Sequence, residues 1–374
     1  MGRSLPGKLQ MATPTCSWKG YWYATEIWSM AMTVQPFNTS GGASIYQIPL
    51  EVFPGFWGCA YLALVDGYRV LIDTGSGFGD SNQHLEGGLQ GAGAQAVSSG
   101  LAVPQPFSFA DLTHILITHG HIDHFGGLAY IRSRSRAQVG VHELDRRILT
   151  RYEERVVVVA RRLGDFLVEA GVPLDDRSRL LDMYRMNKAL FSSVSVDFTY
   201  EAGGMRLGPF EFLHVPGHCA GHVVIRLHDV LFTGDHVLHD TSPHQAPERL
   251  TLSTGLDHYL SSLNLLKPWA VEARLALGGH EEPITDLPER IDAVYKLHLD
   301  RLEKVLGLLA EPGTVSDVAH GLFGKPRGYH ELLALEEAGA HVEYLYQRGL
   351  LEIANLDEVD ACDGPVSTRY RRVY

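Results

Sequence analysis

The sequence predicts a folded protein of the α+β class, with short β-strands in its first three quarters and helices near its end. Its 374 residues are 45% hydrophobic, which is enough to bury a core and excludes disordered, collagen-like and simple coiled-coil chains. β-Rich runs bounded by glycine and proline recur through residues 43–277. From about Pro288, apolar residues recur at helical spacing. The length itself predicts two or three domains.

The N-terminal part divides into an extension and the first strands of the main domain. Residues 1–40 show no clear periodicity, and we interpret them as an N-terminal extension. Residues 41–292 are expected to form the main domain. Its first strands are expected at residues 44–50, 59–65 and 68–73, the last two joined by a hairpin turn at Asp66-Gly67.

The rest of the main domain alternates between strands and two irregular stretches. Residues 75–100 hold eight glycines, so we expect a loop with one weak helix, because each interior glycine costs a helix about 1 kcal/mol. In residues 143–193, charged and apolar residues alternate at helical spacing, which predicts a helical insertion. Further strands are expected at residues 112–118, 194–200, 210–215, 223–227, 230–233 and 273–277.

The C-terminal part has the order helix, helix, helix, strand. The amphipathic stripe is followed by a short helix with an N-cap at Thr314, a longer helix at Tyr329–Tyr346, and a turn and strand at residues 348–353. This order is typical of a small winged-helix domain, which we place at residues 293–354, with a tail at 355–374. The helix Tyr329–Tyr346 contains no Lys or Arg, so we expect packing or a homodimer contact here and no binding to DNA.

Charge and cysteine content narrow the partners. The chain carries 32 Lys and Arg against 44 Asp and Glu, a net charge of −12. It therefore lacks an overall attraction to nucleic acid or to an anionic membrane, and a small-molecule substrate is expected. The four cysteines are scattered and form no CxxC pair, which suits a reducing compartment. We find no signal peptide and no run of about 18 apolar residues, so the sequence predicts a cytoplasmic location.

The strongest functional signal is His119-x-His121-x-Asp123-His124, which follows an apolar strand directly. This spacing does not put all four side chains on one helical face, but a loop can wrap them around cations. Imidazole nitrogen and carboxylate oxygen are suitable ligands for Zn²⁺ and similar divalent ions. The segment is therefore a candidate metal site.

Together with four further motifs, this segment resembles the metallo-β-lactamase-fold hydrolases. With Thr118 before it, the segment matches the family pattern T-H-x-H-x-D-H. The other motifs, in the family's order, are Leu71-Ile-Asp73-Thr-Gly, Val215-Pro-Gly-His218-Cys-Ala-Gly-His222, Leu231-Phe-Thr-Gly-Asp235 and Leu277-Gly-Gly-His280. The resemblance implies an αββα sandwich. Here the sandwich would carry a helical lid at residues 143–193 and the small winged-helix-like domain found in one subgroup.

The resemblance also implies ligands for two metal ions. These are histidines and aspartates from four of the motifs: His119, His121, Asp123, His124, His218, Asp235 and His280. In the family pattern, the first two histidines and His218 bind one ion, and Asp123, His124 and His280 bind the other. Asp235 would bridge the ions, which leaves room between them for a hydroxide that attacks a carbonyl. Asp123 and Asp235 are the expected catalytic residues.

Residues beside the ligands are expected to support them. Asp73 would orient a ligand imidazole through its other ring nitrogen, and His222 would be a buried histidine bonded to the backbone. Cys219 stands where the family motif has threonine and is not expected to bind metal. The segment after Asp235 should border the pocket, and which of its histidines touches the substrate is left open. These histidines are His236, His239 and His244.

Two positions indicate the branch of the family. His121 stands where flavodiiron relatives carry Glu, and Asp235 where the best-known zinc β-lactamases carry Cys, so the set resembles the glyoxalase II and lactonase side. This implies a dinuclear metal-dependent hydrolase of small-molecule thioesters, esters or lactones. Two divalent ions are the implied cofactors. Zn is the first expectation, and Fe and Mn also suit this ligand set.

Three other functions stay open. Relatives with winged-helix tails cut RNA, so a phosphodiesterase or nuclease is one alternative, although it would need a basic groove. A non-catalytic binding protein is the second, and the complete ligand set argues against it. The third is a persulfide dioxygenase with one iron, which would need only His119, His218 and Asp235 and would leave Asp123 and His280 without a role.

The insertion is expected to lie over the metal centre. Its apolar residues, such as Phe166, Tyr184 and Phe191, would either pack it onto the sandwich or line a pocket for an apolar group. Its arginines would form an exposed, salt-bridged face or meet an anionic group such as a phosphate. These arginines are Arg151, Arg155, Arg161, Arg162, Arg177, Arg179 and Arg185.

Overall fold

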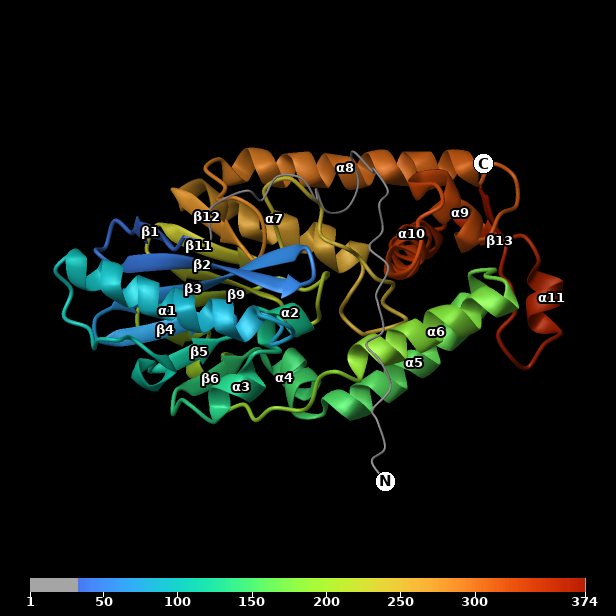
Figure 1. Cartoon of the computed structure of the whole chain (residues 1–374). Helices are drawn as coiled ribbons and strands as arrows, with labels where there is room; N and C mark the ends of the chain where they lie inside the picture. Colours follow the sequence, from blue (N-terminus) through green and yellow to red (C-terminus); the bar gives the residue numbers. More distant parts are fainter. Residues whose placement is uncertain (1–32, 374) are drawn as a thin grey trace, which may run out of the picture.

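Two β-sheets pack face to face in the computed structural model, which describes residues 33–373, and helices cover the outer face of each sheet (Figure 1). This is the αββα sandwich that the sequence predicts, so the fold class is confirmed. Residues 1–32, which make up most of the predicted extension, lie outside the described residues. None of the helices in the described part of the chain is both long and apolar enough to cross a membrane.

The first sheet contains seven strands in sequence order. Strands β1 to β4 pair antiparallel, whereas β4 to β7 pair parallel. The strands are β1 (Gln35–Asn38), β2 (Ser44–Phe53), β3 (Phe56–Val65), β4 (Tyr68–Ile72), β5 (His114–Leu116), β6 (Gln138–Val141) and β7 (Phe198–Thr199). Strand β1 lies within the predicted extension and pairs with β2 of the main domain; the division into domains stays a prediction.

The second sheet has the order β12-β11-β10-β9-β8. Its strands pair antiparallel except for β11 and β12, which run parallel. The strands are β8 (Arg206–Leu207), β9 (Phe210–His214), β10 (Val223–Leu227), β11 (Val230–Gly234) and β12 (Leu275–Gly278). The parallel pair at the edge places the loops after β11 and β12 side by side, and both loops carry predicted ligands.

Alternation along the strands explains why the sheets are covered on both faces. In β2, Ile45 points into the core between the two sheets, whereas Tyr46 packs against the helices outside. In β10, Ile225 lies in the central core and Val224 in the outer one. Successive side chains of a strand point to opposite faces, so a strand that is apolar throughout can be buried only between two layers.

Helix α1 (Ser81–Ser98) is longer and more regular than the weak helix predicted for the glycine-rich stretch. Close packing explains its glycines, because a Cβ on Gly88 would lie 2.1 Å from Cγ2 of Ile48. The helix therefore lies nearer to the sheet than alanine would allow. Burial of Leu85 and Leu89 offsets the low helix propensity of glycine, as tertiary packing commonly does.

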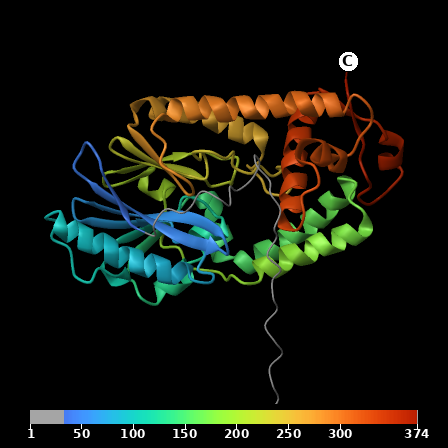
Figure 2. The ribbon, with the colours of Figure 1, turned by 45° about the horizontal axis from the view of Figure 1, so that its top comes forward.

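The remaining helices of the main domain cover the sheets or extend away from them. The predicted insertion forms three helices. Two of them, α5 and α6, pack against each other, extend away from the sandwich and reach the C-terminal helices (Figures 1 and 2). Helix α7 was not expected from the sequence and covers the second sheet. The helices are α2 (Ile122–Phe125), α3 (Leu128–Arg132), α4 (Glu143–Thr150), α5 (Tyr152–Glu169), α6 (Leu174–Lys188) and α7 (Leu256–Glu272), with 3₁₀ turns at Phe109–Asp111 and Glu201–Gly203.

The C-terminal part follows the predicted order of three helices and a strand, and its identification as a winged helix stays a prediction. Figure 2 shows α10 (Tyr329–Gln347) between α8 and the α5–α6 pair, and α10 contacts α6, α7 and α8. The predicted tail is structured, because β14 pairs with β13. The elements are α8 (Leu287–Leu308), α9 (Val315–Phe323), α10 (Tyr329–Gln347), β13 (Leu351–Ile353), α11 (Leu356–Asp360) and β14 (Tyr370–Arg372).

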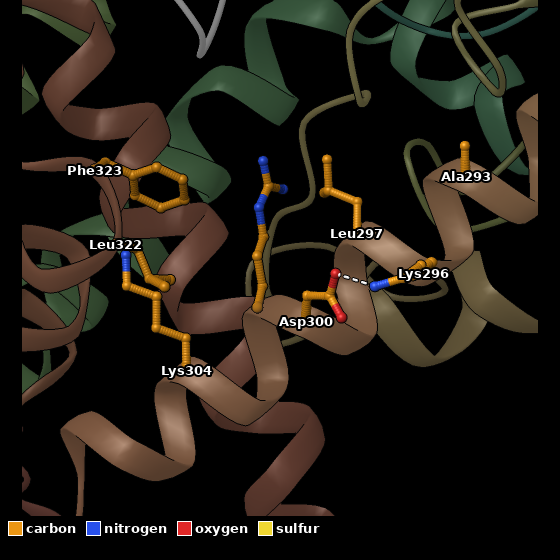
Figure 3. A pocket seen from close by; sticks show the side chains of 8 residues that line it. Ala293, Lys296, Leu297, Asp300, Lys304, Leu322 and Phe323 are labelled. Carbon is orange, nitrogen blue, oxygen red and sulfur yellow. Dashed lines mark hydrogen bonds and ion pairs between the residues drawn. The ribbon is translucent and has the colours of Figure 1, made fainter.

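A pocket lies on the surface of α8 and α9 (Figure 3). Lys296 forms an ion pair with Asp300 at its rim, with 2.6 Å between Nζ and Oδ2. The residues that line it are Ala293, Lys296, Leu297, Asp300, Arg301, Lys304, Leu322 and Phe323. None of them belongs to the five sequence motifs, so this pocket is separate from the candidate metal site.

Candidate metal centre

All seven predicted ligands follow strands, and the structure brings them together. In chain order they are His119 and His121 after β5, Asp123 and His124 in α2, His218 after β9, Asp235 after β11 and His280 after β12. Loops at the carboxyl ends of neighbouring parallel strands lie next to one another, so segments far apart in the chain share this edge. In Figure 1 the edge is marked by α2 and faces α5, α6 and α10.

One triad consists of His119, His121 and His218. A ring nitrogen of each lies within 4.8 Å of the others, and Nε2 of His119 is 3.1 Å from Nδ1 of His121. Burial lowers the pKa of all three imidazoles. The neutral form is therefore favoured, and this is the form that binds a metal ion.

The other triad consists of Asp123, His124 and His280, with ligand atoms within 4.8 Å of one another. Nε2 of His280 is 3.4 Å from Oδ2 of Asp123. Burial opposes protonation of His124 and His280, but the nearby carboxylates outweigh it and raise the pKa of both imidazoles well above the usual value. Burial likewise opposes ionisation of Asp123, but the two histidines hold its pKa below the usual range. The carboxylates around this triad thus stabilise positive charge at the position of the two imidazoles.

Asp235 contacts residues of both triads. Its Oδ1 is 3.4 Å from Nε2 of His124, and its Oδ2 is 3.4 Å from Nε2 of His280 and 3.8 Å from Nε2 of His218. Gly279 makes this approach possible, because a Cβ there would lie 2.4 Å from Oδ1 of Asp235. Burial would raise the pKa of Asp235, but the charges of His280 and His124 hold it well below the usual value.

Three buried polar atoms test whether these residues suit a metal. Nε2 of His124, Nε2 of His218 and Oδ1 of Asp235 have no hydrogen-bond partner among residues 33–373. A buried polar atom without a partner is costly, and here the three atoms belong to residues that converge on one point. Nitrogen and carboxylate oxygen suit a divalent ion, so the residues fit the metal ions that the sequence implies.

Asp73 supports two ligand histidines, His124 directly and His119 through Thr118. Its Oδ2 is 2.8 Å from Nδ1 of His124 and accepts a hydrogen bond from Oγ1 of Thr118 at 2.7 Å. Oγ1 of Thr118 in turn lies 3.1 Å from Nδ1 of His119. These bonds turn Nε2 of both imidazoles toward the centre, which is the arrangement that orients metal-binding histidines. The position of Asp73 agrees with the supporting role expected for it.

Backbone carbonyls orient two further histidines. Nδ1 of His218 donates to the carbonyl of His244 at 2.7 Å, and Nδ1 of His280 donates to the carbonyl of Trp57 at 2.7 Å. His222 lies beside the centre and points its Nε2 at the backbone N–H of Asp235, 3.1 Å away. It is therefore bonded to the backbone, as the sequence analysis expects. The carbonyl partners carry no sequence signal, because any residue type supplies a carbonyl.

Asp145, at the start of α4, supports the site and was missed by the sequence analysis. Its fully buried carboxylate accepts hydrogen bonds from the backbone N–H of Gly120 at 2.7 Å and of Gly221 at 2.8 Å. Sγ of Cys219 lies 3.6 Å from Oδ1, so Cys219 faces this carboxylate. Asp145 thus joins the loop of His119 and His121 to the loop that follows His218.

The C-terminal helices fix the loop that supports His218. The backbone N–H of Gln245 donates to Glu337 of α10 at 2.7 Å, and Glu337 also forms a 2.8 Å ion pair with Arg301 of α8. In the same cluster, Nε2 of His298 lies 3.0 Å from Oγ of Ser242. His298, Glu337 and His341 could be read as ligands. Their polar atoms already have partners, so we interpret the cluster as a structural network.

The three histidines that follow Asp235 differ in burial and in distance from the metal centre. Of the three after Asp235, His244 lies beside the site, with its Nε2 3.3 Å from Glu336 of α10. His236 is fully buried and packs on Tyr259, and His239 is exposed and pairs with Asp240. Of these three histidines, His244 is therefore the one that lies beside both the metal centre and α10.

Comparison with known proteins agrees with this geometry. Residues 58–312 match the metallo-beta-lactamase superfamily. A metallo-beta-lactamase family protein from Thermus thermophilus is 26% identical, with a TM-score of 0.67 over 88% of this chain and 98% of that chain. A beta-lactamase domain protein from Burkholderia ambifaria, 20% identical with a TM-score of 0.62 over 91% of this chain and 94% of that chain, shares the fold. None of the curated proteins compared is significantly similar. Because the family match covers most of the chain and includes all seven converging side chains, the chain belongs to the metallo-beta-lactamase superfamily.

Proposed function

We propose that this protein is a dinuclear metal-dependent hydrolase that cleaves a small-molecule thioester, ester or lactone at its carbonyl. One observation carries the proposal. Asp235 approaches both triads: its oxygens lie 3.4 Å from Nε2 of His124 and of His280 in the second triad, and its Oδ2 lies 3.8 Å from Nε2 of His218 in the first. A ligand set arranged in this way can hold two ions with one shared carboxylate. When bound, divalent ions would supply Lewis acidity and lower the pKa of water to about 7.

The chain's own residues set the charge and orientation of the site. The imidazoles of His119, His121 and His218 are neutral, because burial lowers their pKa values, and each can donate a nitrogen lone pair to a metal ion. Asp123 and Asp235 are ionised carboxylates, because neighbouring histidines hold their pKa values low. We propose these two aspartates as the catalytic residues: they keep negative charge at the centre and offer acceptor oxygens that orient a water molecule toward the substrate.

The proposed substrate class has support of its own. Asp occupies position 235 and His position 121, as on the glyoxalase II and lactonase side of the superfamily. The net charge of −12 and the absence of Lys and Arg from α10 favour a small molecule over nucleic acid or a membrane surface. We also propose Zn as the metal, a winged-helix role for the C-terminal helices and a homodimer. The three described cysteines are free, which supports a proposed cytoplasmic location.

Metal analysis and a substrate panel test the proposal. The purified full chain is loaded with Zn, Fe or Mn, and its metal content is measured after removal of excess ions. Each preparation is then assayed with p-nitrophenyl esters, acyl-CoA thioesters, lactones and bis-p-nitrophenyl phosphate, with chelator-treated protein as the control. We expect about two ions per chain and turnover of a carbon ester that chelation abolishes.

Other outcomes would point to the alternatives. One iron per chain with no ester turnover would favour a persulfide dioxygenase, which has no use for Asp123 and His280. Turnover of the phosphate diester alone would favour a phosphodiesterase or nuclease. Tight metal binding without turnover of any substrate would favour a non-catalytic binding protein.

A further inference from the structure

The insertion brings two cations to the metal centre. Helix α6 packs on α5 and α10 and ends at Lys188, after which the chain returns to the sandwich, where Phe191 packs on Phe53 and Tyr152. The ammonium of Lys188 interacts electrostatically with Asp123 of one triad and His121 of the other. Lys188 therefore lies beside both triads.

Arg155 of α5 belongs to the same place. Its guanidinium interacts with Lys188, with Tyr184 of α6 and with Cys219, the residue next to His218. Two cations from two helices thus face the same side of the site. Their mutual repulsion makes the arrangement unfavourable unless negative charge is supplied.

Neither cation has a carboxylate as a direct partner. Among the described residues, Lys188 and Arg155 form no ion pair, although both are half-buried. Other arginines of the insertion do form ion pairs, such as Arg147 with Glu154 and Arg179 with Glu331. A half-buried cation without a partner is costly. Arg177 of α6 is also half-buried and forms no ion pair within residues 33–373, so what distinguishes Lys188 and Arg155 is that they lie together and interact with residues of the site.

The nearest carboxylates do not neutralise the pair. Asp123 belongs to the proposed metal ligands. Glu336 of α10 interacts with both cations, but burial raises its pKa to about 7. At neutral pH it therefore carries only part of a charge. Asp145 interacts with Arg155, but its carboxylate already accepts hydrogen bonds from two backbone N–H groups. Neither Lys188 nor Arg155 therefore has a carboxylate committed to it alone.

We propose that Lys188 and Arg155 bind an anionic group of the substrate, a carboxylate or a phosphate, that lies several atoms from the scissile carbonyl. This inference rests on the proposed hydrolase and names its substrate class as anionic acyl compounds. Arg binds carboxylate and phosphate through two parallel N–H groups, and Lys adds a point charge. Held at its far end in this way, the substrate would present its carbonyl to the two triads.

The test compares two p-nitrophenyl esters with acyl groups of equal length, the neutral butyrate and the anionic hemisuccinate, on metal-loaded full-length protein. We expect a higher kcat/KM for the hemisuccinate. Lys188→Met and Arg155→Met should each lower this preference about tenfold, because each removes one charge-assisted hydrogen bond. The preference is the ratio of the two kcat/KM values measured on the same protein, so a loss of activity that is common to both esters cancels in it.

A matched control and a third ester sharpen the test. Arg185→Met removes another cation of α6, which is exposed and pairs with Asp182 at 3.9 Å, and should leave the preference unchanged. The p-nitrophenyl ester of 3-phosphonopropionate replaces the carboxylate by a phosphonate. A higher kcat/KM for the phosphonate assigns the subsite to phosphate, and a lower one assigns it to carboxylate.

Product binding separates failure of this inference from failure of the proposed function. Titration calorimetry compares succinate with butyrate on the same metal-loaded proteins, whether or not the esters turn over. Both products carry one carboxylate for the metal centre, so the difference in Kd reports the second anion alone. Tighter binding of succinate that is lost in Lys188→Met and Arg155→Met supports the subsite. Equal binding of the two products, or a preference that survives both substitutions, overturns it. Absence of ester turnover with both ions bound refutes only the hydrolase.

Discussion

The loops that carry the proposed ligands and the pair Lys188 and Arg155, which we call the outer wall of the metal centre, are held in different ways. In the loops, His119, His124, His218 and His280 each have a hydrogen-bond partner at Nδ1, such as Asp73 for His124 and the carbonyl of Trp57 for His280. On the outer wall, Lys188 and Arg155 come from helices that leave the sandwich, and neither has an ion pair among the described residues. Under the proposed function, the sandwich would set the position of the metals, and the added helices would set the charge that faces the substrate. If so, the two properties can be changed separately.

Substitution of the shared ligand should have the largest effect. Asp235→Ala removes the carboxylate that approaches both triads. We expect kcat to fall by about 10³-fold or more and the bound metal to fall below two ions per chain, because residues that act as a unit lose activity together. Turnover and metal content of the same preparation measure both. Asp240→Ala, at an exposed position nearby, is the control. Full activity in Asp235→Ala would exclude the bridging role.

Loss of Asp145 should destabilise the ligand loops without removing a ligand. Asp145→Ala leaves the backbone N–H groups of Gly120 and Gly221 buried without acceptors, and an unsatisfied buried donor costs about 1–3 kcal/mol. We expect the urea midpoint of metal-free protein to fall clearly, and less in Asp145→Asn, which keeps one acceptor oxygen. Asp165→Ala, exposed on α5, should leave the midpoint unchanged. An unchanged midpoint in Asp145→Ala would show that the two loops do not depend on this carboxylate.

Substitution of Asp73 should weaken metal binding more than folding. Asp73→Asn removes the negative charge behind His124 but keeps an acceptor for Thr118. Replacing such a supporting carboxylate typically costs 10- to 100-fold in metal affinity or activity, and we expect a loss of about that size. Competition with a chromogenic chelator measures the affinity. The effect should be confined to the ligand loops, so the hemisuccinate-to-butyrate preference of the remaining activity should stay constant. A changed preference would mean that loops and wall are not separate.

The ligand loops could be predicted from the sequence because their chemistry is local. Strand, histidine-rich loop and short helix occur within a few residues, and all seven side chains that converge lie in motifs that are visible in the sequence. The strand regions were found for the same reason, since alternation is a property of neighbours. Helix α1 was underestimated, because its glycines are explained only by the contact of Gly88 with Ile48, 40 positions away in the chain.

The supporting and outer residues could not be predicted, because their roles arise from contacts across the chain. Asp145 bonds to Gly120 and Gly221, which lie 25 and 76 positions away. In the sequence it is an ordinary acidic residue in the first turn of a helix. Arg155 stood among seven arginines of the insertion as a candidate for an anionic group, and only the packing of α5 against α6 distinguishes it from the surface arginines. Lys188 had no signal at all.

The smallest expected effect is the pH dependence of the hemisuccinate-to-butyrate preference. Burial and the nearby Arg155 lower the pKa of Lys188 to about 8, so its charge is present below that pH and lost above it. The pKa of Glu336, raised by burial to about 7, means that this carboxylate is neutral at lower pH and gains its charge as the pH rises. Both changes therefore make the outer wall less positive as the pH rises.

The groups that face Lys188 from other elements keep the rest of the charge constant. Asp123 of α2 stays ionised, because its pKa is held below the usual range. Burial raises the pKa of Cys219 well above its usual value, so its thiol stays neutral. We therefore expect the preference to fall about three- to tenfold between about pH 6 and pH 9 and not to vanish. Division by the butyrate rate at each pH removes the titration of the metal centre itself. In Lys188→Met the fall should shrink to the contribution of Glu336. A preference that rises with pH in the unsubstituted protein would contradict the assignment of positive charge to this wall.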